Sequence, residues 1–209
     1  MTIAKNAKPA SRPRGRPRAF DRDEALAKAA ETFWRLGYEG ASIADLTAVM
    51  GITPQSLYSA FTSKADLYRE ALQWYQDHVG ASTVAALAEG DAVIALTRLL
   101  SEAAEEFTKK GRPHGCMIST AVLTCATENE PVARHVSGLR GATLALIRAR
   151  VERGIDEGQL SPGTDPEALA RFVGAMIQGM SVQAQDGASR AALLALARHA
   201  VTEIERHRA

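Results

Sequence analysis

The amino-acid sequence predicts an all-α protein of about nine helices. Apolar residues recur every three or four positions along most of the chain, which is the period of a helix with one buried face. Beyond Gly90 no segment shows the strict apolar–polar alternation of a strand. Capping residues, glycines and prolines separate the periodic segments, as they do between helices. At 209 residues the chain is long enough for one or two domains with a hydrophobic core.

The first helix is expected to begin at Asp21, a suitable N-cap with Glu24 in the first turn. Gly37 is expected to end it. Helical spacing predicts a buried face that consists of Leu26, Ala29, Phe33 and Leu36.

Residues 42–64 predict two short helices joined by a glycine turn, which is a helix-turn-helix. Ser42 and Asp45 fit a capping box, and Gly51 supplies the left-handed residue that ends the first of the two helices. Thr53 caps the second, and Pro54 takes its first position, where a missing N–H is harmless. The apolar residues expected to lock the two helices together are Ile43, Leu46, Val49, Leu57 and Phe61.

The remaining helices are expected to be longer. One begins at Ser63 and reaches about His78. The others cover roughly 93–107, 116–127, 131–158, the segment that begins at Asp165-Pro166-Glu167, and the segment between Gly187 and Ile204. This order divides the chain into a disordered basic arm at 1–20, a helix-turn-helix domain at 21–67 and a helical C-terminal domain at 68–209.

The net charge of +1 hides an uneven distribution. Residues 1–22 contain seven of the 25 basic residues and one of the 24 acidic residues. A basic arm on an acidic body is expected where one end of a protein meets a polyanion. The outward residues of the second short helix are Gln55, Ser56, Tyr58 and Ser59, which suit a groove of bases and phosphates. The chain is therefore predicted to bind DNA.

Within the arm, Arg14-Gly15-Arg16-Pro17-Arg18 has an AT-hook-like core. Gly15 would let the backbone approach the floor of a groove, Pro17 would hold it extended, and the arginines would enter a narrow minor groove. An alternative interpretation explains the same residues: the arm is a tail that adds affinity for DNA only by counterion release and does not read the sequence.

From Gly15 to about Leu72 the sequence closely resembles the DNA-binding region of TetR/AcrR-family transcriptional regulators. The residues that carry the resemblance are Phe33-Trp34-Arg35-Leu36-Gly37-Tyr38, Ser42-Ile43-Ala44-Asp45-Leu46, Gly51-Ile52, Ser56-Leu57-Tyr58-Ser59-Ala60-Phe61 and Ser63-Lys64-Ala65-Asp66-Leu67. The resemblance implies an all-helical homodimer that represses transcription from double-stranded, palindromic operator DNA. It also implies that a small molecule releases the operator by binding the C-terminal domain.

The resemblance places Gln55, Ser56 and Tyr58 on the recognition helix and Lys64 beside the phosphate backbone. Ser42 and Thr53 stand at helix N-termini and are candidates for phosphate contact, because free N–H groups and the helix dipole favour an anion. Family members often carry a bulky residue where Ala60 stands, so Ala60 is expected to contribute little to base readout.

For the C-terminal domain we expect a soft, apolar pocket that takes a mostly hydrophobic effector. Its predicted lining residues are Phe107, Cys116, Met117, Phe172, Met176 and Met180, although methionines at helical spacing also fit core packing. The two C-terminal helices are expected to form a four-helix dimer interface. On one helix it uses Gly174, Ala175 and Gly179, and on the other Leu193, Ala197, Ala200 and Ile204.

The segment His114-Gly115-Cys116-Met117 is open to three interpretations. Cys116 is a small buried hydrophobe, a thiol that responds to oxidants or electrophiles, or a Cu(I) ligand together with the neighbouring imidazole and thioether. If Cys116 and Cys125 share a helix, they lie ~14 Å apart along its axis and on opposite faces, which excludes a disulfide between them.

The sequence distinguishes three classes of function: a ligand-responsive repressor, an architectural DNA-binding protein and an enzyme. A ligand-responsive repressor uses both domains, whereas an architectural DNA-binding protein without an effector has little need of ~140 further residues. An enzyme is not predicted, because the sequence has no Gly-rich phosphate loop, recognisable Ser/His/Asp set or His-x-x-x-His spacing. No cofactor or metal is expected. The sequence has two cysteines, no apolar signal region and no apolar run of bilayer length. These features predict a cytoplasmic, nucleoid-associated protein that does not contact the membrane.

Overall fold

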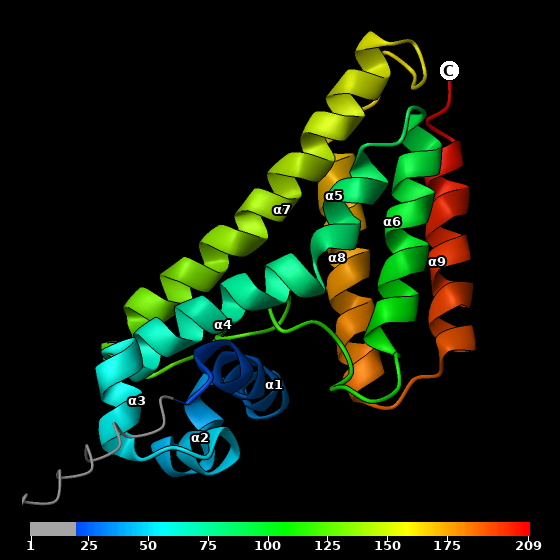
Figure 1. Cartoon of the computed structure of the whole chain (residues 1–209). Coiled ribbons are helices and arrows are strands. Elements are labelled where there is room, and N and C mark those ends of the chain that lie inside the picture. Colours follow the sequence, from blue (N-terminus) through cyan, green and yellow to red (C-terminus); the bar gives the residue numbers. More distant parts are fainter. Residues whose placement is uncertain (1–19) are drawn as a thin grey trace, which may run out of the picture.

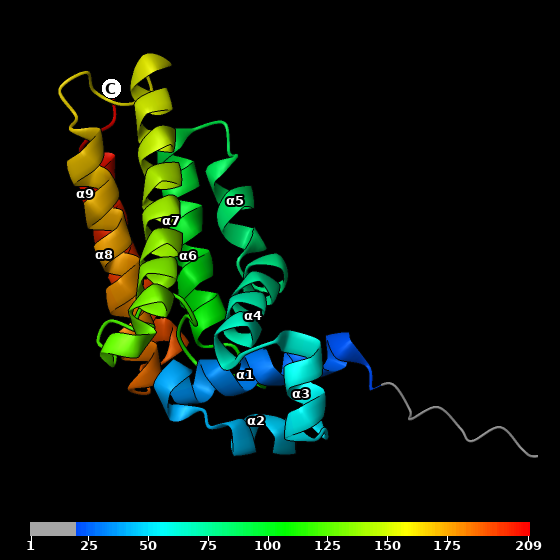
Figure 2. The same cartoon turned by 90° about the vertical axis from the view of Figure 1, so that its left-hand side faces the viewer.

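The computed structural model describes residues 20–209, so the predictions for the arm, including residues 14–18, lie outside the described residues. Within residues 20–209 the fold is all-α, as predicted, and Figures 1 and 2 show its arrangement. The helices are α1 (Arg22–Gly40), α2 (Ile43–Met50), α3 (Pro54–Phe61), α4 (Lys64–His78), α5 (Ala81–Leu87), α6 (Ala92–Phe107), α7 (Glu130–Asp156), α8 (Pro166–Gln185) and α9 (Arg190–Glu205), with a 3-10 turn at Thr127–Asn129.

The first four helices form the lower unit in Figure 1, where α1 packs along α4 and the short α2 and α3 lie beneath them. The side chain of Asp21 accepts the backbone N–H groups of Asp23 and Glu24 at 3.0 and 3.1 Å, which is the predicted cap. Gly37 interrupts α1 with a φ of 73°, and a last turn then continues to Gly40. The first helix therefore extends three residues past its predicted end.

The apolar core of the helix-turn-helix forms largely as predicted, with two exceptions. Val49 is 44% exposed, because α2 turns a single face inward and that face consists of Leu46, Thr47 and Met50. Leu36 is 46% exposed, since it borders an open hollow between α1 and the 112–122 segment. Both residues were expected in the core, and both predictions were wrong.

The remaining helices form a body in which α6 packs against both α8 and α9. The 27-residue α7 begins beside the lower unit and runs to the far end of the body, as Figures 1 and 2 show. The two units share packing, because Met117, Val132 and Val136 belong to the same hydrophobic cluster as the helix-turn-helix residues. No helix within residues 20–209 is both long enough and apolar enough to span a membrane.

The structure contains nine α-helices between residues 20 and 209, but not the nine that were expected. The helix predicted at 116–127 is absent: residues 114–126 form turns, and the carbonyls of Ile118 and Ala121 accept hydrogen bonds from Arg140 of α7 at 3.2 and 2.8 Å. These bonds tie the segment to α7, while within it the N–H of Ala121 donates to the carbonyl of Ile118 at 3.3 Å. Cys116 and Cys125 consequently do not share a helix, and both are free thiols.

The additional helix is α5, which the sequence did not reveal. It has seven residues, and its N-cap is Gly80, which makes no side-chain capping bond. Without a capping residue or a long apolar repeat, such a helix carries no start signal that a sequence-based prediction can use.

Candidate DNA-binding surface and ligand cavity

The α3 helix presents a polar face to the outside. Leu57 and Phe61 point inward and are fully buried, whereas Gln55, Tyr58 and Ser59 on the other face are exposed. Tyr58 is 49% exposed, which is unusual for an aromatic side chain in the middle of a packed unit. Gln55, Tyr58 and Ser59 therefore share one accessible surface, and Ser56 is partly buried beside them.

The caps of α2 and α3 use the hydroxyls that were predicted to contact phosphates. The Ser42 hydroxyl is 2.5 Å from a carboxylate oxygen of Asp45 and accepts the Asp45 N–H at 3.1 Å, so the capping box is complete. Hydrogen bonds from Ser42 hold the pKa of Asp45 below its ordinary value. The Thr53 hydroxyl accepts the backbone N–H of Ser56 at 3.1 Å. Any phosphate contact at these termini would use the remaining backbone N–H groups.

Two cations flank the α3 surface. Lys64 places its ammonium 4.6 Å from the centroid of the Tyr38 ring, and partial burial lowers its pKa. Arg22 lies 4.4 Å over the Phe61 ring and pairs with Glu70 at 2.7 Å. Because Arg22 begins α1, this contact places the start of the described chain next to the end of α3.

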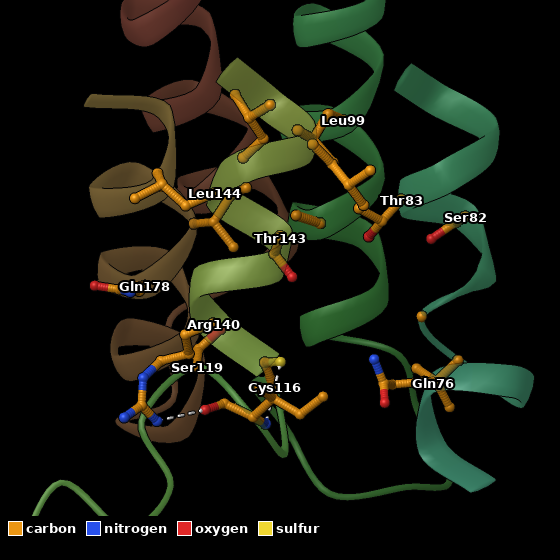
Figure 3. Close-up of a pocket in the computed structure, with 18 of the residues that line it drawn as sticks. Gln76, Ser82, Thr83, Leu99, Cys116, Ser119, Arg140, Thr143, Leu144 and Gln178 are labelled. Atoms are coloured by element: carbon orange, nitrogen blue, oxygen red, sulfur yellow. Dashed lines mark hydrogen bonds between the residues drawn. The ribbon is translucent and has the colours of Figure 1, made fainter. Parts of the chain in front are cut away.

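The body contains a cavity of about 1190 Å³ between α4, α5, α6, α7 and α8. Figure 3 shows its walls, with Leu99 on α6 and Leu144 on α7 among the apolar side chains. Ala103, Phe107 and Ile147 extend this apolar lining. A cavity of this size accommodates a drug-sized molecule.

Of the six residues predicted to line a ligand pocket, Phe107 and Cys116 line this cavity and four do not. Met117 packs in the helix-turn-helix core, and Met180 is fully buried in the body core. Phe172 and Met176 pack against that same body core. The apolar face of α8 is thus core packing, which helical spacing alone could not distinguish from a pocket wall.

Side chains that the sequence analysis did not single out supply the polar part of the cavity. Figure 3 shows Gln76 of α4, Thr83 of α5 and Thr143 of α7 around the central space. Polar residues at these positions carry no sequence signal, because the packing of five helices decides which of them face inward.

Cys116 is held at the cavity wall by contacts with α8. Gly115 has a φ of 76°, and a Cβ there would lie 2.8 Å from the carbonyl oxygen of Ser181. The N–H of Cys116 donates to the Ser181 hydroxyl at 2.8 Å, and its sulfur accepts the N–H of Ile118 at 3.4 Å. Burial raises the pKa of Tyr75 well above its ordinary value, and interactions with Cys116 add to that rise.

The neighbours of Cys116 lie in different surroundings. His114 is exposed, whereas Met117 is 3% exposed within the helix-turn-helix core. A second hollow, of about 700 Å³, lies between α1 and the 112–122 segment. Its lining includes His114, Cys116 and Met117. Among residues 20–209 no three His, Cys, Asp or Glu side chains gather into a metal-binding group.

The residues predicted for the dimer interface divide into two groups. Leu193, Ala197, Ala200 and Ile204 of α9 are at most 2% exposed within a single chain, because they pack in the body core that α6 and α9 share. They cannot also form a surface between two chains, so this part of the prediction was wrong. Gly174, Ala175 and Gly179 lie outside that core cluster, but Gly174 and Ala175 line the cavity. Val182 on the same helix is 43% exposed.

Comparison with known proteins identifies the architecture. Residues 25–71 match the family model described as bacterial regulatory proteins, tetR family, and residues 92–201 match the tetracyclin repressor-like C-terminal domain. The chain belongs to the TetR family. Proteins of this family are transcriptional regulators and not enzymes, as the sequence analysis predicted.

Characterised relatives match this TetR-family chain over most of its length. The transcriptional repressor ComR of Escherichia coli (strain K12) is 34% identical over 88% of this chain and 89% of its own. The repressor BdcR of the same strain is 29% identical over 90% of both chains. A cysteine variant of the TetR-family regulator CifR, solved with 26-bp double-strand operator DNA, is 44% identical over 90% of this chain and 98% of its own, with a TM-score of 0.86.

Proposed function

We propose that this TetR-family protein is a repressor that binds a palindromic operator through α3 and releases it when a small molecule enters the body cavity. The DNA-binding part of this proposal rests on the exposed polar face of α3. On that face Gln55, Tyr58 and Ser59 lie opposite the buried Leu57 and Phe61. The operator complex of the similar regulator CifR supports the same assignment.

The DNA contacts divide by chemistry. Gln55, Ser56, Tyr58 and Ser59 meet base edges and nearby phosphates in the major groove. Lys64 and the N-termini of α2 and α3, at Ser42 and Thr53, meet the phosphate backbone. This division makes α3 the source of sequence selectivity, and the flanking groups the source of affinity for any duplex.

The basic arm adds to this interface. Residues 1–19 contain six basic side chains, and Arg22 marks their attachment beside α3. Deleting residues 1–19 is expected to weaken binding to every duplex and to reduce the salt dependence of binding. An AT-hook-like arm would in addition lose its preference for A·T-rich flanking sequence. An unchanged salt slope would exclude the arm from the DNA interface.

Two copies of the chain are needed to read a palindrome. The exposed face of α8 around Val182, with the partly buried Gly179 one turn earlier, offers small and apolar residues to a symmetric partner. The two α3 helices would then lie about one DNA turn apart, roughly 34–36 Å, or somewhat more.

Release is expected to act through α4. This helix carries Tyr75 and Gln76 at the cavity and Leu67 and Tyr68 in the helix-turn-helix core, so a ligand that shifts α4 also shifts α3. An effector changes operator affinity only by its differential affinity for the two conformations, typically by 5–150-fold.

The experiment that tests this function needs no knowledge of the operator. Sequences selected from a random duplex library by the purified protein are expected to converge on a two-fold symmetric site. Binding to the selected site should exceed binding to random duplex by at least about 10³-fold. A protein that enriches no sequence is not a specific regulator, and an architectural role would then explain it better.

The position of Cys116 favours a second form of the switch. Its thiol lies at the wall of the same cavity, as Figure 3 shows, so an electrophile or oxidant that enters could modify it. Cys116→Ser distinguishes the two forms. Release that persists in this variant assigns the cysteine to packing. Loss of release by oxidants, electrophiles or copper, with operator binding intact, assigns it to sensing.

A further inference from the structure

The cavity combines apolar walls with a few neutral polar groups that remain available. In Figure 3 the Gln76 amide faces Cys116 and Thr143 across the central space, and the Thr83 hydroxyl also points into it. The side chains of Gln76 and Thr83 make no hydrogen bond within residues 20–209, and the Thr143 hydroxyl donates to the carbonyl of Leu139 at 3.2 Å but can still accept. The Thr83 hydroxyl and the Gln76 amide both offer a free donor and a free acceptor, and the amide of Gln76 offers the larger set, with two N–H donors and a carbonyl oxygen.

The charged side chains around the cavity are already engaged. Glu102 pairs with Arg98 at 2.6 Å, Glu106 pairs with Arg112, and Arg171 pairs with Glu167 at 2.6 Å. The carboxylate of Asp77, which also lines the cavity, accepts the amide of Gln73 at 2.9 Å.

Arg140 is engaged in a different way. Its guanidinium donates to the carbonyls of Ile118 and Ala121, and it extends away from Gln76 in Figure 3. Arg140 has no carboxylate partner within residues 20–209, but because it points away from Gln76, a ligand carboxylate placed at Gln76 would not meet it. A ligand ammonium would find two carboxylates with an unpartnered oxygen: Glu102, whose other oxygen is held by Arg98, and Asp77, which is exposed and therefore hydrated.

A charged head group placed at Gln76 would lose its hydration and would not meet the guanidinium of Arg140, which points away from this place. An uncharged molecule with an apolar body would bury that body against Leu99, Phe107 and Ile147. A carbonyl, amide or hydroxyl on the same molecule could bond to Gln76, which would otherwise be buried by the ligand without a partner.

We propose that the cavity selects an uncharged, mostly apolar molecule with one hydrogen-bonding group, and that Gln76 is the side chain that recognises this group. The proposal rests on the cavity being the effector site described above. It names the chemical class of the effector and the residue that determines specificity.

The test compares three probes that share one chain length and differ in head group: decanamide, decanoate and decylammonium. Binding to the full-length protein is measured by calorimetry at pH 7. Decanamide is expected to bind at least about tenfold more tightly than either ion. Equal or tighter binding of an ion, or no measurable binding of decanamide, would overturn the proposal.

Variants locate the selectivity. Gln76→Leu is expected to weaken decanamide binding by about tenfold or more while retaining the fold, because leucine has similar volume but no polar group. Gln73→Leu is the matched control: Gln73 lies one turn earlier on α4 and also lines the cavity, but its amide is already bonded to Asp77. Equal effects of the two substitutions would show that Gln76 has no special role.

Operator binding, measured on the same preparations, separates this proposal from the proposed function. If decanamide binds through Gln76 but leaves operator affinity unchanged, the ligand class holds and effector-induced release fails. If the protein selects and releases its operator but prefers an ionic probe, the function holds and the assignment of Gln76 fails.

Discussion

The indole ring of Trp34 on α1 meets the phenol ring of Tyr75 on α4 edge to face, with their centroids 4.9 Å apart. Tyr75 also lines the ligand cavity, and Trp34 lies in the helix-turn-helix core. One pair of side chains therefore joins the cavity to the DNA-binding unit. The guanidinium of Arg112 lies 5.4 Å from the Trp34 ring, so the 112–122 segment is part of the same contact.

This contact makes Trp34 the expected fluorescent reporter of ligand binding. Trp74 stacks on His78 with centroids 4.5 Å apart and does not line the cavity, although its helix does. The emission change that decanamide produces should persist in Trp74→Phe and disappear in Trp34→Phe. A signal that is lost in Trp74→Phe instead would show that α4 moves without disturbing the Trp34–Tyr75 contact.

Substitutions on the exposed face of α3 should weaken operator binding without affecting stability. Tyr58→Ala and Gln55→Ala are expected to cost about 1–3 kcal/mol of specific binding each, measured by fluorescence anisotropy on the selected operator. Thr202→Ala, on the exposed surface of the distant α9, serves as the control. Wild-type operator affinity in Tyr58→Ala would show that α3 does not read the DNA sequence.

The corrected interface predicts opposite results for two aspartate substitutions in the C-terminal helices. Val182→Asp, on the exposed face of α8, should give a folded monomer with nearly unchanged Tm. Leu193→Asp should unfold the chain or lower its stability by at least about 3 kcal/mol, because it buries an unpaired charge in the body core. Sedimentation and thermal melting distinguish the outcomes. A dimeric Val182→Asp protein would place the interface elsewhere.

Filling the cavity from α7 should block the response to ligand. Gly141 lines the cavity and an added Cβ meets nothing within 4 Å, so Gly141→Phe can project into the open space. Decanamide binding is expected to fall by about tenfold or more, with operator binding retained. Gly138→Phe is the control, because Gly138 on the same helix is equally unobstructed but does not line the cavity. Identical behaviour of the two variants would contradict the location of the site.

The capping box of α2 predicts a dependence of stability on pH. Because hydrogen bonds from Ser42 lower the pKa of Asp45 in the folded protein, the ionised carboxylate stabilises the fold above its unfolded pKa of about 3.8, and this contribution is lost as the pH falls through the folded value. Ser42→Ala should therefore destabilise the protein in urea at pH 7 and have a smaller effect near pH 3. Ser59→Ala, which removes an exposed hydroxyl that makes no cap, should show no such difference.

The sequence by itself determined the ends of α2 and α3 and the exposed face of α3, because the signals for both are local. The ends of α2 and α3 are defined by contacts within four residues, and the structure contains each of them. The residues involved are Ser42 with Asp45, Gly51, Thr53 and Pro54. The outward position of Gln55 and Tyr58 follows from the helical period once Leu57 and Phe61 are placed inside.

The tertiary structure alone decided which faces of the body helices line the cavity, which form the core and which remain exposed. Leu193 and Ile204 fit a dimer stripe and a core stripe equally well until α6 is packed against α9. The helix expected at 116–127 was lost to bonds from Arg140, which lies on another helix. Gln76 and Thr83 meet at one cavity only because α4, α5 and α7 converge there. Each of these outcomes depends on residues far apart in the chain, and the helical period has no information about which partner a face will meet.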